Sequence, residues 1–186
     1  MPAFPELTEP LSSEHVVLRD AAERDIPEVL IAYQDDPELC ARLGRERPPS
    51  AAELGQAAEN EAAERAAGRG AEFTILSPGS DACRGQVNVH HVDWENARGE
   101  LGIWLSPQSR GMGLGSGALA LLAAWLLRDC RLERVELLTE PDNEPMLAAA
   151  RAAGFVYEGV LRAYLLEHGQ RIDVAILSLL PGDLEV

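Results

Sequence analysis

The most informative stretch of this chain is residues 101–118, LGIWLSPQSRGMGLGSGA. An apolar, strand-like run ends near Pro107, a loop with Arg110 and several glycines follows, and an amphipathic helix begins directly after it. Glycine leaves backbone N–H groups accessible because it has no Cβ. The first turn of a helix adds unpaired N–H groups and a partial positive charge. The stretch therefore predicts a cradle for a phosphate or diphosphate group.

Other interpretations of this loop are weaker. A P-loop requires a lysine, and the chain contains none. A dinucleotide-binding fingerprint formed by Gly113, Gly115 and Ala118 would normally open a βαβ unit, whereas this loop comes late and follows a strand of a meander. A glycine turn without a ligand stays open as an alternative. However, four glycines alternating over residues 111–117 are costly unless something must approach the backbone closely.

Composition excludes several classes of protein. With 186 residues, of which 46% are hydrophobic and 25% charged, the chain suits one folded domain. No apolar run approaches the ~18–20 residues of a membrane span, and the first ten residues lack the regions of a secretion signal. The net charge of −15, from 16 arginines and 31 acidic residues, argues against binding to nucleic acid or an anionic membrane. It is compatible with a cationic substrate.

The cysteines point to a reducing compartment. Cys40, Cys83 and Cys130 are far apart, their number is odd and no C-x-x-C occurs. Neither a disulfide framework nor a zinc site is supported by this pattern. We therefore expect a cytoplasmic protein without a metal.

Periodicity and turn residues predict the order of elements. Residues 1–13 are expected to be a flexible lead-in, and residues 14–183 a single domain. Capping residues and apolar spacing predict helices at 25–33, 50–67, 116–129 and 145–153. Strands are expected at 15–19, 72–76, 86–94, 100–105, 134–139, 156–161 and 172–179, with a turn at 168–170. The expected fold class is α/β, with a mixed, mostly antiparallel sheet and helices on both faces.

The motif RGMGLG at residues 110–115 resembles the R/Q-x-x-G-x-G/A signature of the GNAT superfamily of acyl-CoA-dependent N-acyltransferases. Further motifs follow in the order seen in its Rim branch, which contains the ribosomal-protein N-terminal acetyltransferases. These are PDN at 141–143, GFVYEG at 154–159 and GQRIDV at 169–174. The resemblance covers about residues 15–183 and implies a GNAT-like domain that uses acetyl-CoA or another short acyl-CoA.

The resemblance also implies which residues bind the cofactor. In GNAT proteins the strand before the glycine loop separates from the next strand, and the acyl-pantetheine arm lies in the gap. The implied pantetheine contacts are backbone groups of Ile103, Trp104 and Leu105 and the side chain of Asn143, which has helix N-capping as a compatible second role. The implied diphosphate contacts are the N–H groups of Gly111, Met112, Gly113, Leu114, Gly115 and Ser116. Arg110 adds a phosphate contact, with a solvated loop charge as the alternative.

Amine attack on a thioester requires a base, because only the neutral amine is nucleophilic. Glu100 is the first candidate for this catalytic role, because several GNAT members carry a catalytic Glu at the head of this strand. A solvated Glu at a strand start is the other interpretation. His90 and His91 are second choices, and since neighbouring strand residues point to opposite faces, at most one is expected to face the cleft. By analogy, the N–H of Leu105 stabilises the oxyanion.

The general acid is less clear from the sequence. Met146 and Ala150 occupy the positions where the family places Ser or Tyr, and neither side chain donates a proton. Tyr157, Tyr164 or solvent are the remaining proton donors.

The acceptor is expected to be a primary amine, either a small cationic molecule or a peptide N-terminus. Trp94 and Trp104 could wall its site, although at least one is expected in the core. Four acidic residues could line it, each with a solvated surface charge as the alternative: Glu140, Asp142, Glu158 and Asp173. The alternative functions are an aminoglycoside-type antibiotic N-acetyltransferase and a non-catalytic acyl-CoA sensor. A homodimer through a late strand is a further expectation.

Overall fold

The structure, a computed structural model, describes residues 3–167 and 169–184. Within these residues eight strands form one sheet: β1 (Leu11–Ser12), β2 (Val17–Asp20), β3 (Ala71–Leu76), β4 (Gly85–Asp93), β5 (Arg98–Leu105), β6 (Arg134–Thr139), β7 (Val156–Glu167) and β8 (Gln170–Leu179). The α-helices are α1 (Ile26–Asp35), α2 (Leu39–Arg42), α3 (Ala51–Ala66), α4 (Leu114–Arg128) and α5 (Glu144–Ala152). Three short 3-10 helices are η1 (Glu23–Asp25), η2 (Pro107–Ser109) and η3 (Pro181–Asp183).

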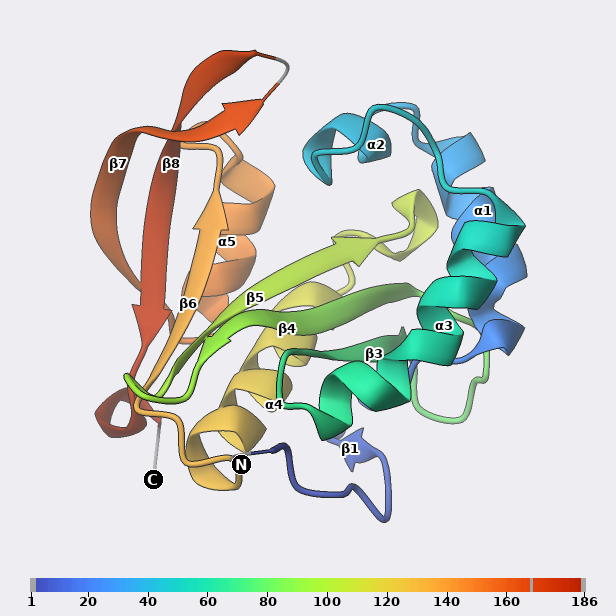
Figure 1. The fold of residues 1–186 in the computed structure, drawn as a ribbon, viewed down its shortest axis with the longest axis horizontal. Coiled ribbons are helices and arrows are strands. Elements are labelled where there is room, and N and C mark those ends of the chain that lie inside the picture. The colour runs from blue at the N-terminus through green and yellow to red at the C-terminus, as the bar shows by residue number, and fades with distance from the viewer. Residues whose placement is uncertain (1–2, 168, 185–186) are drawn as a thin grey trace.

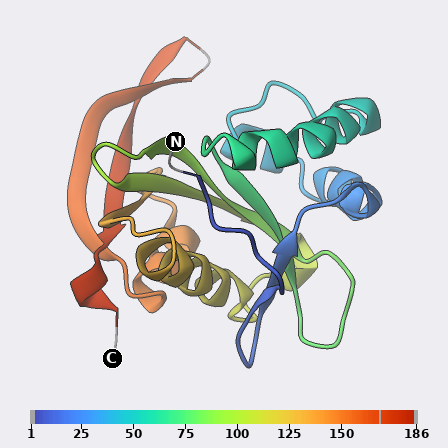
Figure 2. The ribbon, with the colours of Figure 1, turned by 60° about the horizontal axis from the view of Figure 1, so that its bottom comes forward.

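The strands lie in the order β1-β2-β3-β4-β5-β6-β8-β7, and β5 with β6 is the parallel pair. The other neighbours are antiparallel. Helix α4 provides the crossover that a parallel pair needs. Helices α1 to α3 cover one face of the sheet, and α4 and α5 the other (Figures 1 and 2). This confirms the predicted α/β class with a mostly antiparallel sheet and helices on both faces.

Two apolar clusters hold these layers together. The larger contains α4, in which nine of fifteen residues are buried, including the fully buried Leu119, Leu122 and Leu126. Each such leucine contributes roughly 1.5–3 kcal/mol through burial. The smaller cluster lies on the opposite face, where Tyr33 of α1 and other buried residues contact Trp104 of β5. Within the described residues, every helix is too short or too polar to cross a membrane.

Most predicted elements occur within two residues of their expected bounds. The capping box at the start of α3 is confirmed, because Ser50 Oγ accepts the Glu53 N–H at 3.2 Å and Glu53 Oε2 accepts the Ser50 N–H at 2.8 Å. Helix α4 begins two residues earlier than predicted, with Gly113 as its N-cap. Strand β7 continues to Glu167 because it forms a long, twice-interrupted ladder with β8. The predicted turn at 168–170 includes residue 168, which lies outside the described residues.

Residues 3–13, part of the segment expected to be flexible, make specific contacts with the domain. Phe4 is only 8% exposed, and its ring lies 5.3 Å from Trp94 and 5.8 Å from Trp125, centroid to centroid. Leu11 and Ser12 form β1, which pairs with β2 at the edge of the sheet. A single aromatic residue in a proline-containing segment has no periodicity, so the sequence gives no signal for this packing. The aromatic contact stabilises residues 3–13 against the domain.

Candidate active site

The ladder between β5 and β6 ends before either strand does. The two strands pair from Arg98 with Arg134 to Leu101 with Leu137. Beyond that point β5 continues to Leu105, while β6 continues to Thr139 and remains paired with β8. Figure 1 shows the two strands diverging above their paired ends. Within residues 3–167 and 169–184, one side of β5 therefore has no strand partner from Gly102 onward.

The register of β4 with β5 shows which peptide groups face this gap. Ser106 donates its N–H to the carbonyl of Arg84, and Trp104 lies opposite Gln86 in the same ladder. Hydrogen-bonded and non-bonded pairs alternate in an antiparallel ladder. The peptide groups of Ile103 and Leu105 therefore point away from β4 into the gap. The peptide groups of Trp104 point toward β4, and therefore away from the gap where its pantetheine contact was predicted.

The glycine loop joins the open end of β5 to α4. Gly111 and Gly113 have φ angles of +73° and +76°, which favour glycine, and open space surrounds the position where either would carry a Cβ. Gly113 caps α4 without a side-chain hydrogen bond, so the first N–H groups of this buried 15-residue helix remain available. Gly115 packs closely, because a Cβ there would lie 3.3 Å from Leu105.

The remaining predicted loop residues have mixed surroundings. Met112 is 65% exposed, whereas the Leu114 side chain is buried in the larger cluster and offers only its backbone. Ser116 donates its hydroxyl to the carbonyl of Gly113 at 3.0 Å. Apart from Arg110 and Ser116, residues 110–116 have no polar side chain, so main-chain N–H groups are the donors that this loop can offer.

Arg110 is held by the protein itself. Its guanidinium forms an ion pair with the buried Asp36 and donates to the carbonyl of Leu105 at 3.1 Å. Burial is the largest single influence and would raise the pKa of Asp36, but the hydrogen bond and charge of Arg110, with the Glu38 N–H and the charge of Arg42, together outweigh it and lower that pKa. The pair connects the end of α1 to the start of the glycine loop. Arg110 therefore has a structural role, and a phosphate contact, as predicted, would be a second role for the same guanidinium.

Asn143 fulfils its predicted capping role. Its Oδ1 accepts the Met146 N–H at 3.2 Å at the start of α5, and its Nδ2 donates to Thr139 Oγ1 at 3.1 Å. These bonds fix the side chain where β6 ends, at the far wall of the gap. The amide is half-buried.

Three cross-strand pairs form a polar row on the face of β4 and β5 that α1 and α3 cover. Trp104 Nε1 donates to Gln86 Oε1 at 3.2 Å. Gly102 lies opposite Asn88, whose Oδ1 accepts the Gly102 N–H at 3.1 Å. A Cβ at Gly102 would lie 2.6 Å from that oxygen, so only glycine admits the Asn88 side chain. The third pair is His90 with Glu100.

Glu100 contacts both histidines, although neighbouring strand residues normally point to opposite faces. Of the two histidines, His90 lines the cavity described below, so the expectation that at most one faces the cleft is not contradicted. His90 Nε2 lies 3.3 Å from Glu100 Oε1, and His91 Nδ1 lies 3.1 Å from Glu100 Oε2. The reason is an irregularity in the β4–β5 ladder after His90, where His91 has a φ of +49° and breaks the alternation of faces. Burial is the largest single influence and would raise the pKa of Glu100, but the hydrogen bonds and the electrostatic attraction of both histidines together outweigh it and lower that pKa.

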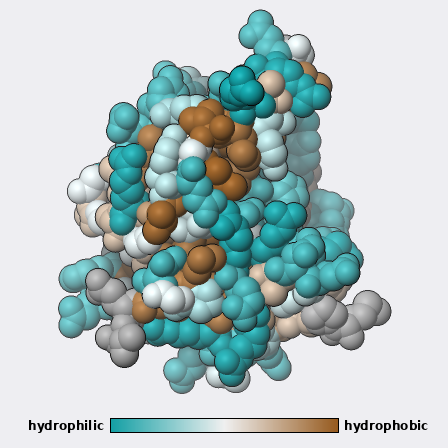
Figure 3. Space-filling model, turned by 90° about the vertical axis from the view of Figure 1, so that its left-hand side faces the viewer, coloured by the Kyte–Doolittle hydropathy of each residue, from teal (hydrophilic) through white to brown (hydrophobic). Residues whose placement is uncertain are grey.

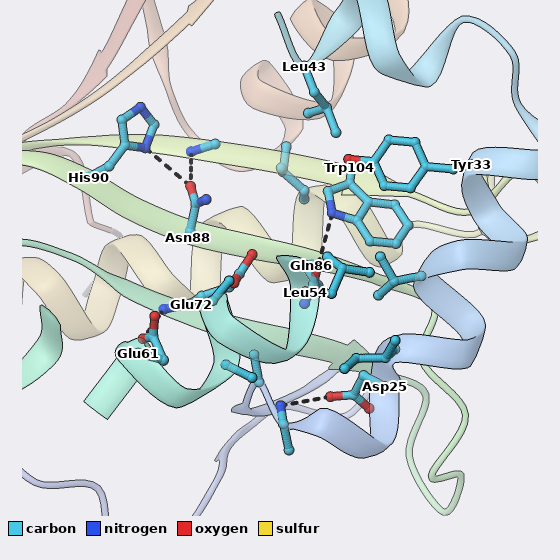
Figure 4. A pocket seen from close by; sticks show the side chains of 18 of the residues that line it. Asp25, Tyr33, Leu43, Leu54, Glu61, Glu72, Gln86, Asn88, His90 and Trp104 are labelled. Carbon is cyan, nitrogen blue, oxygen red and sulfur yellow. Dashed lines mark hydrogen bonds between the residues drawn. The ribbon is translucent and has the colours of Figure 1, made fainter. Parts of the chain in front are cut away.

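A cavity of about 300 Å³ lies beside this row, between the sheet and helices α1 and α3. Figure 4 shows Gln86, Asn88, His90 and Trp104 along one wall, with Tyr33 near Trp104 and Glu61 and Glu72 at the α3 side. Sequence reasoning missed most of these residues. One wall could have been predicted from the alternation along β4. The polar Gln86, Asn88 and His90 alternate with the buried Val87 and Val89 and so share one face of the strand.

The cavity has an acidic end. Burial, and then the nearby Glu61 carboxylate, raise the pKa of Glu72 to about 7. Burial also raises the pKa of Glu61, whose Oε1 accepts the Glu72 N–H at 2.7 Å. Arg45 also lines the cavity and opposes the shift at Glu72. A cationic group placed there would relieve the repulsion between the two carboxylates.

Other predicted acceptor-site residues have structural partners. Glu158 forms hydrogen bonds with Arg134 and Ser178, which lower its pKa to about 2. Asp173 Oδ1 accepts the Ala163 N–H at 2.7 Å, and Glu140 contacts Thr139 and Asn143. Asp142 is exposed. Trp94 packs against the larger cluster and donates to the carbonyl of Gly68, so one of the two tryptophans is a core residue, as expected.

The candidates for proton donation are dispersed. Ala150 is fully buried, and Met146 packs against the larger cluster. Tyr157 and Tyr164 are 43% and 50% exposed on β7. Tyr33, which the sequence did not single out, is the tyrosine that lines the cavity, and burial raises its pKa.

The fold is that of solved acetyltransferase structures. The family model described as "Acetyltransferase (GNAT) domain" matches residues 15–156, so the chain belongs to the GNAT acetyltransferase family. It is 30% identical over 175 residues to the uncharacterized N-acetyltransferase p20 of Bacillus licheniformis. This alignment covers 92% of this chain and 96% of p20. It is 30% identical over 116 residues, 62% of each chain, to Bacillus subtilis (strain 168) YdaF, provisionally named a ribosomal N-acetyltransferase. Mycobacterium smegmatis RimJ in complex with a CoA disulfide has a TM-score of 0.81 at 21% identity, over 96% of this chain and 93% of that chain.

Proposed function

We propose that this protein transfers an acetyl or other short acyl group from acyl-CoA to a primary amine. The observation that carries the proposal is the gap beside β5. Peptide groups of Ile103 and Leu105 face it, and it leads directly into the glycine loop at the N-terminus of α4. An extended amide chain ending in a diphosphate fits these two features in sequence. Acyl-CoA would supply the activated thioester.

The residues of the gap would bind and orient this co-substrate. The peptide groups of Ile103 and Leu105 would pair with the amides of the pantetheine arm, as a further strand would. The N–H groups of residues 111–116 would hold the diphosphate. The Leu105 carbonyl already accepts from Arg110, so its N–H would serve either this pairing or, by the family analogy, the thioester carbonyl oxygen. Asn143 is fixed at the opposite wall, where a small rotation of its amide would reach the arm.

Glu100 would accept the proton of the amine, directly or through a water. It lies on β5 three residues before the gap-facing Ile103, on the face that carries the cavity, and its side chain is 22% exposed. The two histidines orient its carboxylate oxygens. General base catalysis of this kind contributes typically ~10²–10⁴-fold to the rate.

The acceptor would enter the cavity under α1 and α3. Its acidic end at Glu61 and Glu72 favours a cationic group, and Trp104 provides an apolar wall. A volume of about 300 Å³ admits a small amine or the first residue of a peptide. YdaF is provisionally named a ribosomal N-acetyltransferase, and this name supports a peptide acceptor over a small amine.

An acceptor panel tests this proposal. The purified protein is incubated with acetyl-CoA and either small diamines or short peptides with a free N-terminus, and thiol release and the acetylated product are measured. We expect turnover with at least one amine and none with N-blocked peptides. CoA binding without thiol release on any amine would refute the transferase and favour a sensor.

A homodimer and a cytoplasmic location stay predictions. Strand β7 is an edge of the sheet and exposes six large apolar residues: Val156, Tyr157, Val160, Tyr164, Leu165 and Leu166. Figure 3, which faces the side where β7 lies, shows apolar patches among polar side chains. This surface supports the dimer, because an exposed apolar edge strand favours pairing with a second copy. Sedimentation of the wild type and of Leu166→Glu would test it.

A further inference from the structure

His90, His91 and Glu100 bring three metal-ligand atoms together where the ladder of β4 with β5 is interrupted. One donor atom from each residue lies within 4.8 Å of the other two. The imidazole rings are 4.6 Å apart, centroid to centroid, at an interplanar angle of 68°. The positive φ of His91 is costly for a residue other than glycine, and it is what turns this side chain toward Glu100.

The hydrogen bonds around His90 leave one nitrogen available to a cation. Asn88 Oδ1 accepts the Gly102 N–H, which identifies this atom as the amide oxygen. His90 Nδ1 lies 3.2 Å from the same oxygen and must therefore donate its proton there. The other nitrogen, Nε2, then faces Glu100 Oε1 at 3.3 Å. A neutral imidazole in this tautomer would present its lone pair to a carboxylate, unless a proton or metal ion lies between them.

This arrangement has the features of a metal site with its supporting contacts. A ligating histidine typically donates its other N–H to an oxygen, as His90 does to Asn88. Ligands 2.0–2.2 Å from a tetrahedral zinc ion are about 3.3–3.6 Å from one another. The two histidine nitrogens lie 3.3 Å and 3.1 Å from different oxygens of Glu100, and the three ligand atoms lie within 4.8 Å of one another, so small side-chain rotations would bring them to that spacing. Two imidazoles and one carboxylate select Zn²⁺, Co²⁺ or Ni²⁺ over Mg²⁺ and Ca²⁺.

We propose that His90, His91 and Glu100 bind one divalent transition-metal ion of the zinc class, and that the bound ion silences acyl transfer. The exposed side of His91 leaves the fourth position open to water. The inhibitory half of this inference rests on the proposed function, because a metal ion on the Glu100 carboxylate prevents it from accepting a proton. The binding half does not depend on it. This proposal departs from our expectation, based on the sequence, that the protein binds no metal.

The binding test uses Co²⁺, whose visible absorption reports the ligands directly. Co²⁺ is titrated into metal-free wild type, His91→Ala, Asn88→Ala and the control His15→Ala, which removes an exposed histidine elsewhere. His91 is 77% exposed, so its removal is compatible with folding. We expect one ion per chain, loss of the tetrahedral spectrum in His91→Ala, about 10–100-fold weaker binding in Asn88→Ala, and no change in His15→Ala.

Two results would overturn the inference. Unchanged binding in His91→Ala, or no saturation below about 1 mM Co²⁺ in the wild type, would exclude the site whatever the protein catalyses. The inhibitory half is tested by measuring the acetylated product with and without one equivalent of Zn²⁺. We expect the ion to inhibit the wild type relative to its metal-free rate, and to leave His91→Ala at that variant's own metal-free rate, whatever that rate is. A bound ion with an unchanged rate would overturn that half, and with it Glu100 as the base, while the binding site stands.

Discussion

Replacing Glu72 with Gln should stabilise the folded protein and weaken its hold on a cationic acceptor. Burial and the neighbouring Glu61 raise the pKa of Glu72 from 4.5 to about 7. Each pKa unit corresponds to about 1.4 kcal/mol, so an ionised Glu72 costs the folded state up to ~3 kcal/mol. Glutamine has nearly the same shape and no charge, so Glu72→Gln removes this cost.

The sign of the pH dependence follows from the raised pKa. Below pH about 4.5 the carboxyl is protonated in both the folded and the unfolded chain, and it contributes no cost. As the pH rises to about 7 the unfolded chain ionises first, so the wild type loses stability over this range. Above pH 7 the whole cost is present. Glu72→Gln should therefore equal the wild type in stability near pH 4 and exceed it at pH 8.

Urea denaturation at pH 4, 6 and 8 measures this difference. The matched control is Glu95→Gln, which makes the same change of charge at an exposed position. At pH 8 we expect Glu72→Gln to raise the free energy of unfolding by ~1–3 kcal/mol, and Glu95→Gln to leave it nearly unchanged. In the transfer assay, Glu72→Gln should raise the KM for the amine. Equal stabilities at all three pH values would refute the acidic cavity.

Three further substitutions test the site. Gly113→Glu should abolish CoA binding in calorimetry by placing a carboxylate at the diphosphate, whereas Gly79→Glu, at a turn glycine with a similar φ of +74° and open surroundings, should not; equal losses would count against the cradle. Glu100→Gln should lower kcat by ~10²-fold or more with CoA affinity retained, and an unchanged kcat would remove Glu100 as the base. Gly102→Ala should displace the Asn88 side chain, since a Cβ there lies 2.6 Å from Oδ1, and so weaken Co²⁺ binding in the spectroscopic titration; unaltered binding would contradict the role of Asn88.

Local signals in the sequence predicted the parts of the fold that depend on a few neighbouring residues. The capping box at Ser50, the glycine loop before α4 and the capping role of Asn143 are of this kind. Each is set by backbone geometry and hydrogen bonds within about four residues, so the residue types alone identify it. Arg110 was identified as the start of the loop, but its partner Asp36 is 74 positions away and no local pattern indicates it.

The parts that the sequence did not predict depend on contacts between distant segments. The separation of β5 from β6 was expected only from the family resemblance, because no local pattern shows that their ladder ends at Leu101. The raised pKa of Glu72 depends on Glu61, which a different element supplies. The turn of His91 toward Glu100 results from an irregular ladder that alternation rules do not foresee. In each case the residues were visible in the sequence but their common location was not.

A crystal structure of this protein with bound CoA tests the central claim most directly. We expect the diphosphate within hydrogen-bonding distance of the N–H groups of residues 111–116, and the pantetheine amides paired with Ile103 and Leu105. A nucleotide bound elsewhere, with the loop and the side of β5 both free of it, would contradict the account.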